Sequence, residues 1–515
     1  MKKIICAILS FAALLSLSSC EDWLQATSST QFQADQIFDT RDGYIDALTG
    51  VYLTMGNSTV YGANTTWRYT DVMTYVYETF TSRRLGNWQQ HNYSHVDVRS
   101  DIASIWEGYY NIIANANMVL SKLDQGRGLF SSEVEFNLVK GELLAIRAYV
   151  HFDLMRLFGV CSWGGENASK LTIPYVTEYG MTTTGQLTYA ETEKLLLADV
   201  EEALMLLADD PVTGVKPEGF DQGPNADGYW DKRQRHLNLY AVEALAARIY
   251  LWKNDLAKAE EYARKALDGA FGSSLVQWLD VDELVTTYKD EEKDWTFSCE
   301  HIFGLEITGL NSLTTSILAD VSSSSSDAFK LDSRAVDILF SETTYSVDDV
   351  HVTEWLDEGY EDIRGTALLL RYSQGAYECF KLYGTSTSSA KYRNLMPMIR
   401  LTEMYYIIAF CCMSDGRDDE ARRILDDIRL HRGIQEPLES YRNTPDELER
   451  EVFKEFLNEG QTLYWRRLFQ TRFLGQYGYL SGAYNVMGIQ GVSDDAALIL
   501  PYPDDEIDYG RRQDL

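Results

Sequence analysis

The sequence predicts a mostly α-helical protein built from helical hairpins, with a loop-rich half and a few short strands. Apolar residues recur at helical spacing over residues 102–120, 142–158 and 191–208. Residues 236–268 have the pattern of two helices joined by a tight turn, and this pattern recurs at 403–430. Helical periodicity fades over residues 270–395, which are rich in serine, threonine, glycine and tyrosine. We therefore expect a helical scaffold that carries long loops.

The first twenty residues have the features of a lipoprotein signal peptide. Two lysines precede an apolar run from Ile4 to Leu17, which is shorter than the ~18 residues needed to span a bilayer. The run ends in Leu17-Ser18-Ser19-Cys20, which resembles a bacterial lipobox. We expect residues 1–19 to be removed and Cys20 to carry lipid, with palmitate as a typical acyl chain, on its thiol and amine. An ordinary cleaved signal with a chance cysteine is the alternative.

The mature chain is expected to be extracytoplasmic and held to the membrane through its lipid alone. Residues 20–36 are polar and are interpreted as a lipidated tether, and the folded domain is expected to span residues 37–515. Acidic residues number 78 against 46 lysines and arginines, so the formal net charge is −32. Such a balance repels nucleic acid and anionic headgroups, and neither is an expected partner.

Five cysteines follow the lipidation site, and they form neither a disulfide framework nor a metal-binding spacing. They are Cys161, Cys299, Cys379, Cys411 and Cys412. We expect small buried hydrophobes, although one bridge is compatible with the sequence.

The segment from Glu142 to Phe158 has two apolar stripes, which is typical of a helix buried between neighbours. Arg147 lies between these stripes. A buried charge needs a partner, so we expect Arg147 to be paired inside the scaffold rather than in an active site.

The clearest hairpin joins a helix from Leu237 to Trp252, a turn at 253–255 and a second helix from Leu256 to Leu267. Small and large residues alternate there as in a tetratricopeptide hairpin. The second copy, at 403–430, is distant in sequence, so we expect scattered hairpins rather than a continuous solenoid.

The chain contains no H-E-x-x-H, P-loop, G-x-G-x-x-G or G-x-S-x-G motif. A glycosidase needs only two carboxylates, but with 78 acidic residues some pair will always look plausible. Candidates such as Glu358, Glu361 and Asp362 are therefore interpreted as solvated surface. We expect no catalysis, cofactor or metal.

Aromatic residues are the remaining functional clue, because the chain has 33 tyrosines and 11 tryptophans. Residues 67–93 combine Trp67, Trp88 and Tyr93 with polar side chains. Such rings suit the C–H face of a sugar, although core packing is the better explanation for any one of them.

Several motifs in order resemble the SusD/RagB family of nutrient-binding surface lipoproteins over nearly the whole mature chain. The first pair is the helix with Trp106, Tyr110, Ile113 and Asn117, then Gly141-Glu142 through Ile146-Arg147-Ala148-Tyr149 to Phe152-Asp153-Leu154-Met155-Arg156-Leu157-Phe158-Gly159. Later matches are Arg248, Tyr250 and Leu251, Met398 to Glu403, Arg429, Arg432 and Gly433, Glu455-Phe456, Glu459-Gly460-Gln461, and Leu500-Pro501-Tyr502-Pro503-Asp504. Departures at Val160-Cys161-Ser162, Phe410 and residues 462–467 indicate a divergent branch.

The resemblance implies a SusD-like fold with hairpins mainly over 100–268 and 400–470 and an irregular binding region mainly over 55–100 and 270–395. In such proteins the ligand face combines these irregular parts, which here adds Trp295, Trp355 and Tyr360 to the candidates. The implied role is capture of an oligosaccharide at the exterior of the outer membrane and its delivery to a SusC-like TonB-dependent transporter. Oligopeptide binding, glycoside hydrolysis and a helical-repeat scaffold are the alternatives.

Overall fold

The computed structural model describes residues 37–515 with gaps at 75, 288–292, 320–324, 341, 348–349, 356–360, 370, 374–375, 380, 384–391, 474–497, 511 and 513–515. The predicted signal peptide, Cys20 and the tether at 20–36 lie outside the described residues. Among the helices that are described, none combines the length and the apolar character needed to cross a membrane.

Helices dominate the described chain, as predicted. They are α3 (Arg41–Met55), α4 (Tyr69–Val72), α5 (Arg83–Gln89), α6 (Val96–Leu123), α7 (Glu133–Phe158), α8 (Tyr189–Leu206), α9 (Leu239–Lys253), α10 (Leu256–Gly272), α11 (Val281–Thr286), α12 (Leu310–Leu318), α13 (Ser333–Phe340), α14 (Leu401–Ser414), α15 (Asp418–Leu430), α16 (Thr444–Phe456), α17 (Thr462–Phe473) and α19 (Asp504–Asp508). Two π-helical segments, η1 (Asn64–Arg68) and η11 (Arg364–Leu369), lie in the irregular regions.

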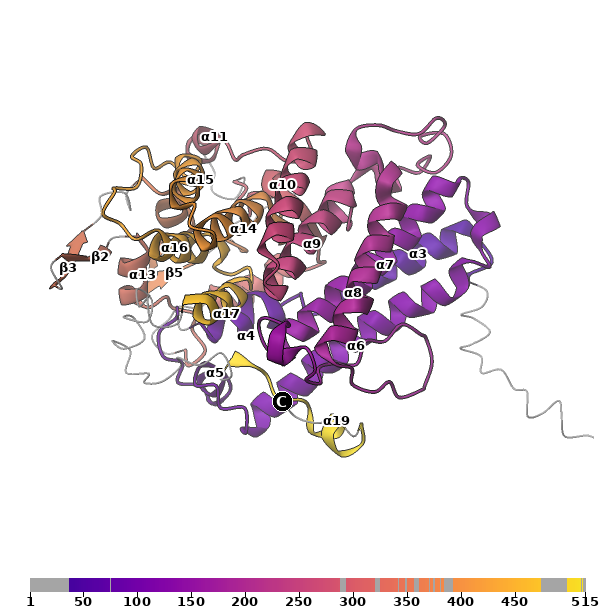
Figure 1. The fold of residues 1–515 in the computed structure, drawn as a ribbon, viewed down its shortest axis with the longest axis horizontal. Coiled ribbons are helices and arrows are strands. Elements are labelled where there is room, and N and C mark those ends of the chain that lie inside the picture. Colours follow the sequence, from indigo (N-terminus) through magenta and orange to yellow (C-terminus); the bar gives the residue numbers. More distant parts are fainter. Residues whose placement is uncertain are drawn as a thin grey trace, which may run out of the picture.

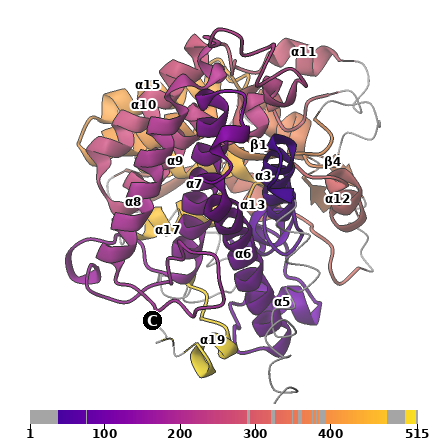
Figure 2. The same cartoon turned by 90° about the vertical axis from the view of Figure 1, so that its right-hand side faces the viewer.

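The long helices pack in sequence order, α6 on α7, α7 on α8 and α9 on α10, and α10 then packs on α14 (Figures 1 and 2). The C-terminal helices α14 to α17 gather on the other side of α10 from α7 and α8 (Figure 1). Hairpins that are distant in sequence therefore become neighbours in one helical scaffold.

Both predicted hairpins are confirmed. Asn254 ends α9 with a φ of 70°, a left-handed conformation that asparagine tolerates, and Asp255 then accepts a hydrogen bond from the Lys258 amide at 3.3 Å. Gly416, with a φ of 76°, makes the equivalent turn between α14 and α15.

Helix α7 is buried almost throughout, as its two stripes predict. Arg147, 8% exposed, donates to both carboxylate oxygens of Asp199 on α8, at 2.7 and 2.6 Å. It also donates to Asn117 Oδ1 on α6 at 2.9 Å. The prediction of an internal partner for this charge is confirmed, and the contacts of Arg147 join three helices.

The strands form two-stranded antiparallel pairs among the described residues. They are β1 (His301–Glu306) with β6 (Leu395–Arg400), β2 (Glu342–Val347) with β3 (Val350–Trp355), and β4 (Arg371–Ser373) with β5 (Ala376–Glu378). The β1–β6 register runs from His301 opposite Arg400 to Glu306 opposite Leu395. These pairs and the loops between them make residues 270–395 the irregular half.

A buried ion cluster joins this half to the C-terminal helices. The Arg432 guanidinium lies 2.7 Å from Glu300 Oε2 and 2.8 Å from Glu455 Oε1, and all three side chains are fully buried. Burial alone would raise the pKa of Glu455, but Arg432 and Arg400 hold it well below its usual value. Motif residues of the C-terminal part are therefore structural.

Gly460 shows why one motif position is a glycine. Its φ is 76°, and a Cβ there would lie 2.4 Å from Thr66 Cα. The turn before α17 therefore lies directly against η1, so a C-terminal segment contacts an N-terminal one.

The expectation that Asp362 is solvated surface is wrong, because its carboxylate is fully buried and pairs with Arg364 at 2.7 Å. Glu361 is exposed as expected, and Glu358 lies outside the described residues. The structure describes all five cysteines after Cys20 and shows no disulfide between them, and each is buried except the half-buried Cys299. The expectation of small buried side chains is therefore confirmed for the other four.

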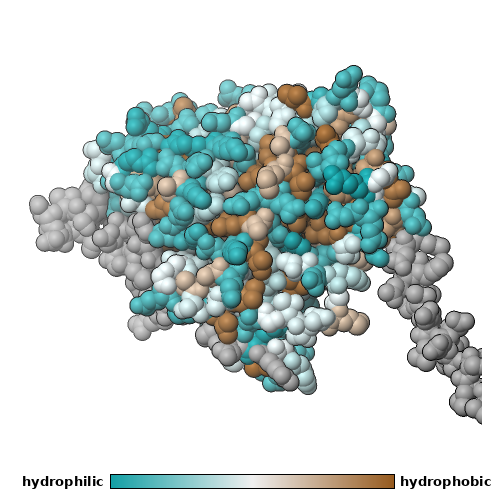
Figure 3. Space-filling model, turned by 45° about the vertical axis from the view of Figure 1, so that its right-hand side comes forward, coloured by the Kyte–Doolittle hydropathy of each residue, from teal (hydrophilic) through white to brown (hydrophobic). Residues whose placement is uncertain are grey.

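The face shown in Figure 3 is largely hydrophilic, with apolar patches among the hydrophilic residues. Individual exposed apolar side chains include Met181, Met205 and Val215.

Candidate functional site

The aromatic residues predicted in the 67–93 segment occupy different depths. Trp88 is completely buried in α5, where its ring stacks on Tyr69 with centroids 4.5 Å apart and planes at 10°. Its Nε1–H donates to Asp101 Oδ2 at 3.0 Å. Both the ring face and the polar edge of Trp88 are used inside the protein, so it does not form an exposed stacking surface.

Trp67 and Trp295 are also buried rather than exposed. Trp67, in η1, is 0% exposed and donates its Nε1–H to the Gly62 carbonyl oxygen at 3.1 Å. Trp295 is 2% exposed, with the Lys293 ammonium 5.3 Å from its ring centroid. A ring that packs on protein through both faces offers none to a sugar, so neither of these indoles presents a free face for stacking.

Tyr93 is the half-buried member of the segment. Its ring meets Trp88 edge to face, with centroids 6.3 Å apart, and lies 6.2 Å from His91. Burial lowers the pKa of His91 to about 4, so this imidazole is neutral at physiological pH. Tyr93 is therefore a half-buried aromatic ring that packs on the buried Trp88 and lies near the neutral His91.

Charged groups border this aromatic group. Arg84 Nη1 lies 3.2 Å from Asp101 Oδ1, and its side chain is 47% exposed. The Arg68 guanidinium lies 5.0 Å from the Tyr69 ring centroid. Arg84 holds the same carboxylate that receives the Trp88 indole, so Asp101 links the partly exposed Arg84 to the buried Trp88.

The other two predicted residues belong to the irregular half. Trp355 is the last residue of β3, with its backbone opposite Glu342. Tyr360 lies outside the described residues. Contact of either with a ligand stays a prediction.

A half-exposed aromatic group that sequence reasoning missed lies where α14 and α15 meet the chain after α10. The Trp278 ring stacks on His431 with centroids 4.1 Å apart and planes at 15°, and Tyr405 lies 5.2 Å away. Trp278, Tyr405 and His431 are all half-buried. Trp278 lay within the region expected to bind ligand, but nothing in the sequence joined it to Tyr405 and His431.

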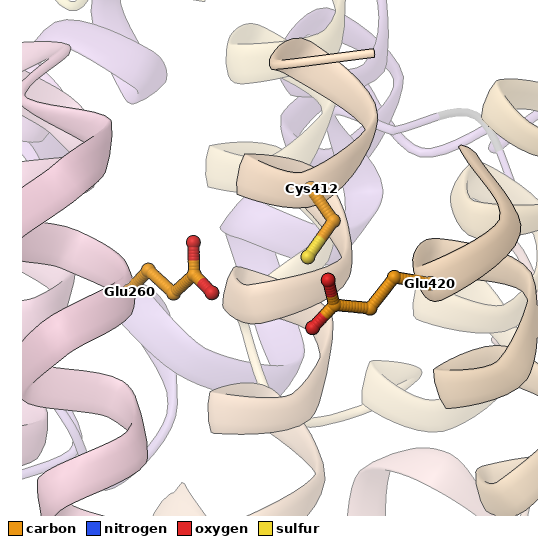
Figure 4. A group of neighbouring side chains, drawn as sticks. All are labelled: Glu260, Cys412 and Glu420. Carbon is orange, nitrogen blue, oxygen red and sulfur yellow. The ribbon is translucent and has the colours of Figure 1, made fainter. Parts of the chain in front are cut away.

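One cluster has the side-chain types of a metal site. Glu260 on α10, Cys412 on α14 and Glu420 on α15 bring one ligand atom each within 4.8 Å of one another (Figure 4). Burial, with Glu260 nearby, raises the pKa of the Cys412 thiol to about 11, so the thiol is protonated at neutral pH.

Two guanidinium groups already hold these carboxylates. Arg264 donates to Glu260 at 2.9 Å and to Glu420 at 2.7 Å, and Arg417 donates to Glu420 at 3.0 Å and to Glu260 at 3.2 Å. A cation would have to displace both arginines and deprotonate the thiol. The cluster is therefore a set of ion pairs that connects the α9–α10 hairpin to the α14–α15 hairpin.

Comparison with protein families finds two matches along the chain. Residues 22–218 match a family described as "Starch-binding associating with outer membrane", and residues 335–487 match one described as "SusD family". A SusD-like protein of Formosa agariphila is 24% identical over 153 residues, which is 28% of each chain, so the chain spans under a third of this curated relative.

Solved structures extend the likeness over the fold. A SusD superfamily protein from Bacteroides thetaiotaomicron is 20% identical with a TM-score of 0.64, covering 92% of this chain and 99% of that chain. A second from the same organism is 15% identical with a TM-score of 0.67, covering 91% and 96%. A laminarin-binding SusD-like protein is 18% identical with a TM-score of 0.58, covering 91% and 97%.

Proposed function

The chain belongs to the SusD/RagB family, and from this premise we propose that it is a glycan-binding lipoprotein of the outer membrane surface. It captures an oligosaccharide without cutting it and delivers it to a SusC-like TonB-dependent transporter. The observation that carries the proposal is the pair of family matches, at residues 22–218 and 335–487, on a fold that aligns with SusD superfamily structures over nine tenths of its length.

Glycan as the ligand class is supported by two findings about similar proteins. One matching family is described as starch-binding and associated with the outer membrane, and one similar structure binds laminarin. Both ligands are glucose polymers, whose rings present C–H faces to aromatic side chains. Within this chain, the half-buried Tyr93 and the irregular region around Trp355 and Tyr360 are the proposed contacts.

The buried indoles have a different role in this proposal. Trp67, Trp88 and Trp295 hold the backbone and the neighbouring polar groups in position, while less buried rings contact the sugar. Trp88 does so for Tyr93 directly, because the two rings are in edge-to-face contact.

A transporter partner follows from topology as well as from the family. A lipoprotein that is held at the surface by acyl chains cannot by itself move a sugar across the membrane. Stable complexes of this kind commonly bury more than about 2,000 Å². Mild detergent extraction of the native membrane should therefore co-purify a TonB-dependent β-barrel.

The ligand is tested by calorimetric titration of the purified protein with laminarin and starch oligosaccharides, and with a mixture of oligopeptides. Saturable glycan binding supports the proposal, whereas selective peptide binding would identify an oligopeptide-binding member. Tyr93→Ala should weaken glycan binding about tenfold in protein that remains folded, and Tyr179→Ala, at a 58% exposed ring elsewhere, should not. Release of reducing ends would instead establish a hydrolase, and absence of both ligand and barrel would favour a scaffold.

A further inference from the structure

A groove of about 740 Å³ opens on the helical scaffold between α8, α9 and α10. Its apolar wall comes from Leu204, Ala208, Leu239 and Tyr240, and Glu243 and Lys265 supply charge. The groove uses none of the residues proposed for glycan contact, and it lies on the hairpin unit rather than in the irregular half.

Glu243 is a buried carboxylate that lines this groove. It is only 2% exposed, and its Oε1 pairs with Lys265 Nζ at 2.8 Å. Its other oxygen, Oε2, is buried and has no hydrogen-bond partner within the described part of the chain. An ionised buried oxygen without a donor is costly, so this position is suited to a ligand that brings one.

The charge around the groove favours a cation. Glu261 and Asp268 line it as exposed carboxylates, and with Glu243 they outnumber the cations. Arg264 also lines it, but its guanidinium is held by Glu260 and Glu420. Lys265 is then the one cation left to balance three carboxylates among the described lining residues.

The apolar wall indicates that the cationic ligand carries an aliphatic chain. Leu204 and Leu239 are half-exposed, and Tyr240 contributes its ring beside Glu243. An aliphatic chain can lie on these side chains while its charged end reaches the carboxylate, as the stems of lysine residues do on protein surfaces. Lys265 already demonstrates that Glu243 accepts an ammonium group.

We propose that the groove between α8, α9 and α10 binds a primary ammonium group carried on a short aliphatic chain. The ammonium donates to Glu243 Oε2, and the chain packs on Leu204, Leu239 and Tyr240. This chemistry belongs both to free alkylamines and to lysine side chains. Burial raises the pKa of Glu243, and a bound ammonium would lower it.

The test is a ligand-observed NMR titration of the full-length protein with n-pentylammonium chloride as probe. Pentan-1-ol is the neutral match, and Nα-acetyl-lysine methylamide is the probe for a lysine source. We expect saturable binding of the ammonium and little binding of the alcohol. Tighter binding of the lysine derivative would identify a peptide source, and tighter binding of pentylammonium a free amine.

Variants assign the binding to this groove. Glu243→Gln should weaken pentylammonium binding by more than about tenfold, because the charged acceptor is lost. Lys265→Met should strengthen it, because the competing ammonium is removed. Glu201→Gln, at an exposed position of α8 outside the groove, should leave it unchanged.

A matched pair decides the question even if Glu243→Gln does not fold. Ala208 is exposed and lines the groove, so Ala208→Lys adds a tethered ammonium and Ala208→Met adds similar bulk without charge. Ala208→Lys should abolish binding, and Ala208→Met should retain more of it. Equal binding of alcohol and ammonium, no saturable binding, or equal effects of the two Ala208 variants would overturn the proposal.

Discussion

Arg147 and Asp199 form a bidentate ion pair that ties α7 to α8 inside the scaffold, with Nε 2.7 Å from Oδ2 and Nη2 2.6 Å from Oδ1. Their side chains are 10% and 8% exposed. Tyr175 donates to the same carboxylate at 2.6 Å, so Asp199 depends on a fixed set of donors. The pair is a stability element rather than a ligand site.

Arg147→Ala should lower the free energy of unfolding by about 3 kcal/mol or more, because Asp199 is left buried without its cation. Urea unfolding followed by circular dichroism measures this loss. Ligand binding should fall only as far as the folded fraction falls. A stable variant with selectively lost affinity would show instead that α7 lines the site.

Lys140→Ala is the matched control, since Lys140 and Glu202 form another ion pair between α7 and α8 at 2.9 Å. Their side chains are 27% and 44% exposed, so solvent screens the pair. We expect a loss below about 1 kcal/mol. Equal losses from the two variants would contradict the assignment of the difference to burial.

Trp88→Ala should destabilise the protein by about 3–5 kcal/mol, because it removes a fully buried indole and takes away the indole donor of Asp101 Oδ2. The burial of Trp88 makes this candidate aromatic residue a packing residue in the first place. Differential scanning calorimetry measures the effect. Trp278→Ala, at a half-exposed ring, should cost less stability. An unchanged melting temperature for Trp88→Ala would contradict the packing of Trp88 against Tyr69 and Asp101.

His151 should stay neutral in the folded protein down to acidic pH. Burial lowers its pKa to about 3, while Val176 N–H donates to Nε2 at 3.0 Å and Nδ1 lies 2.8 Å from the Arg147 carbonyl oxygen. These contacts assign the Nδ1–H tautomer. Protonation would break the bond from Val176.

Stability should depend on pH accordingly. The unfolded chain binds a proton at His151 near pH 6.5, whereas the folded chain does not until about pH 3. The contribution of His151 to stability is therefore fully present above pH 6.5 and is lost as the pH falls toward 3. Nitrogen NMR of the imidazole during an acid titration checks this, with the urea-unfolded protein as reference; a folded-state pKa near 6.5 would disprove it.

Cys20 is predicted to anchor the chain. Intact-mass analysis of the membrane fraction should find a mature chain that begins at acylated Cys20, and Cys20→Ala should release the protein from membranes. Unlipidated wild-type protein in the medium would contradict the lipobox interpretation.

The sequence by itself determined the helical scaffold and the role of individual charges in it. The two apolar stripes of α7 indicate that both sides of the helix are buried. A charged side chain between them then needs a partner, as Arg147 has in Asp199. The α9–α10 turn at Asn254 is likewise encoded locally, because periodicity and turn chemistry depend on neighbouring residues.

Tertiary structure alone decided which aromatic residues are covered. Trp88 is buried against Tyr69 and Asp101. Trp278 stays half-exposed and contacts Tyr405 and His431, which both lie more than a hundred residues after it in the sequence. Similarly, Asp71 accepts a hydrogen bond from the Asn458 amide at 2.6 Å across 387 residues of sequence. The burial of a ring depends on contacts with segments that are distant in the sequence. A local pattern therefore indicates that an aromatic ring packs in the core or binds a ligand, but it does not distinguish between the two.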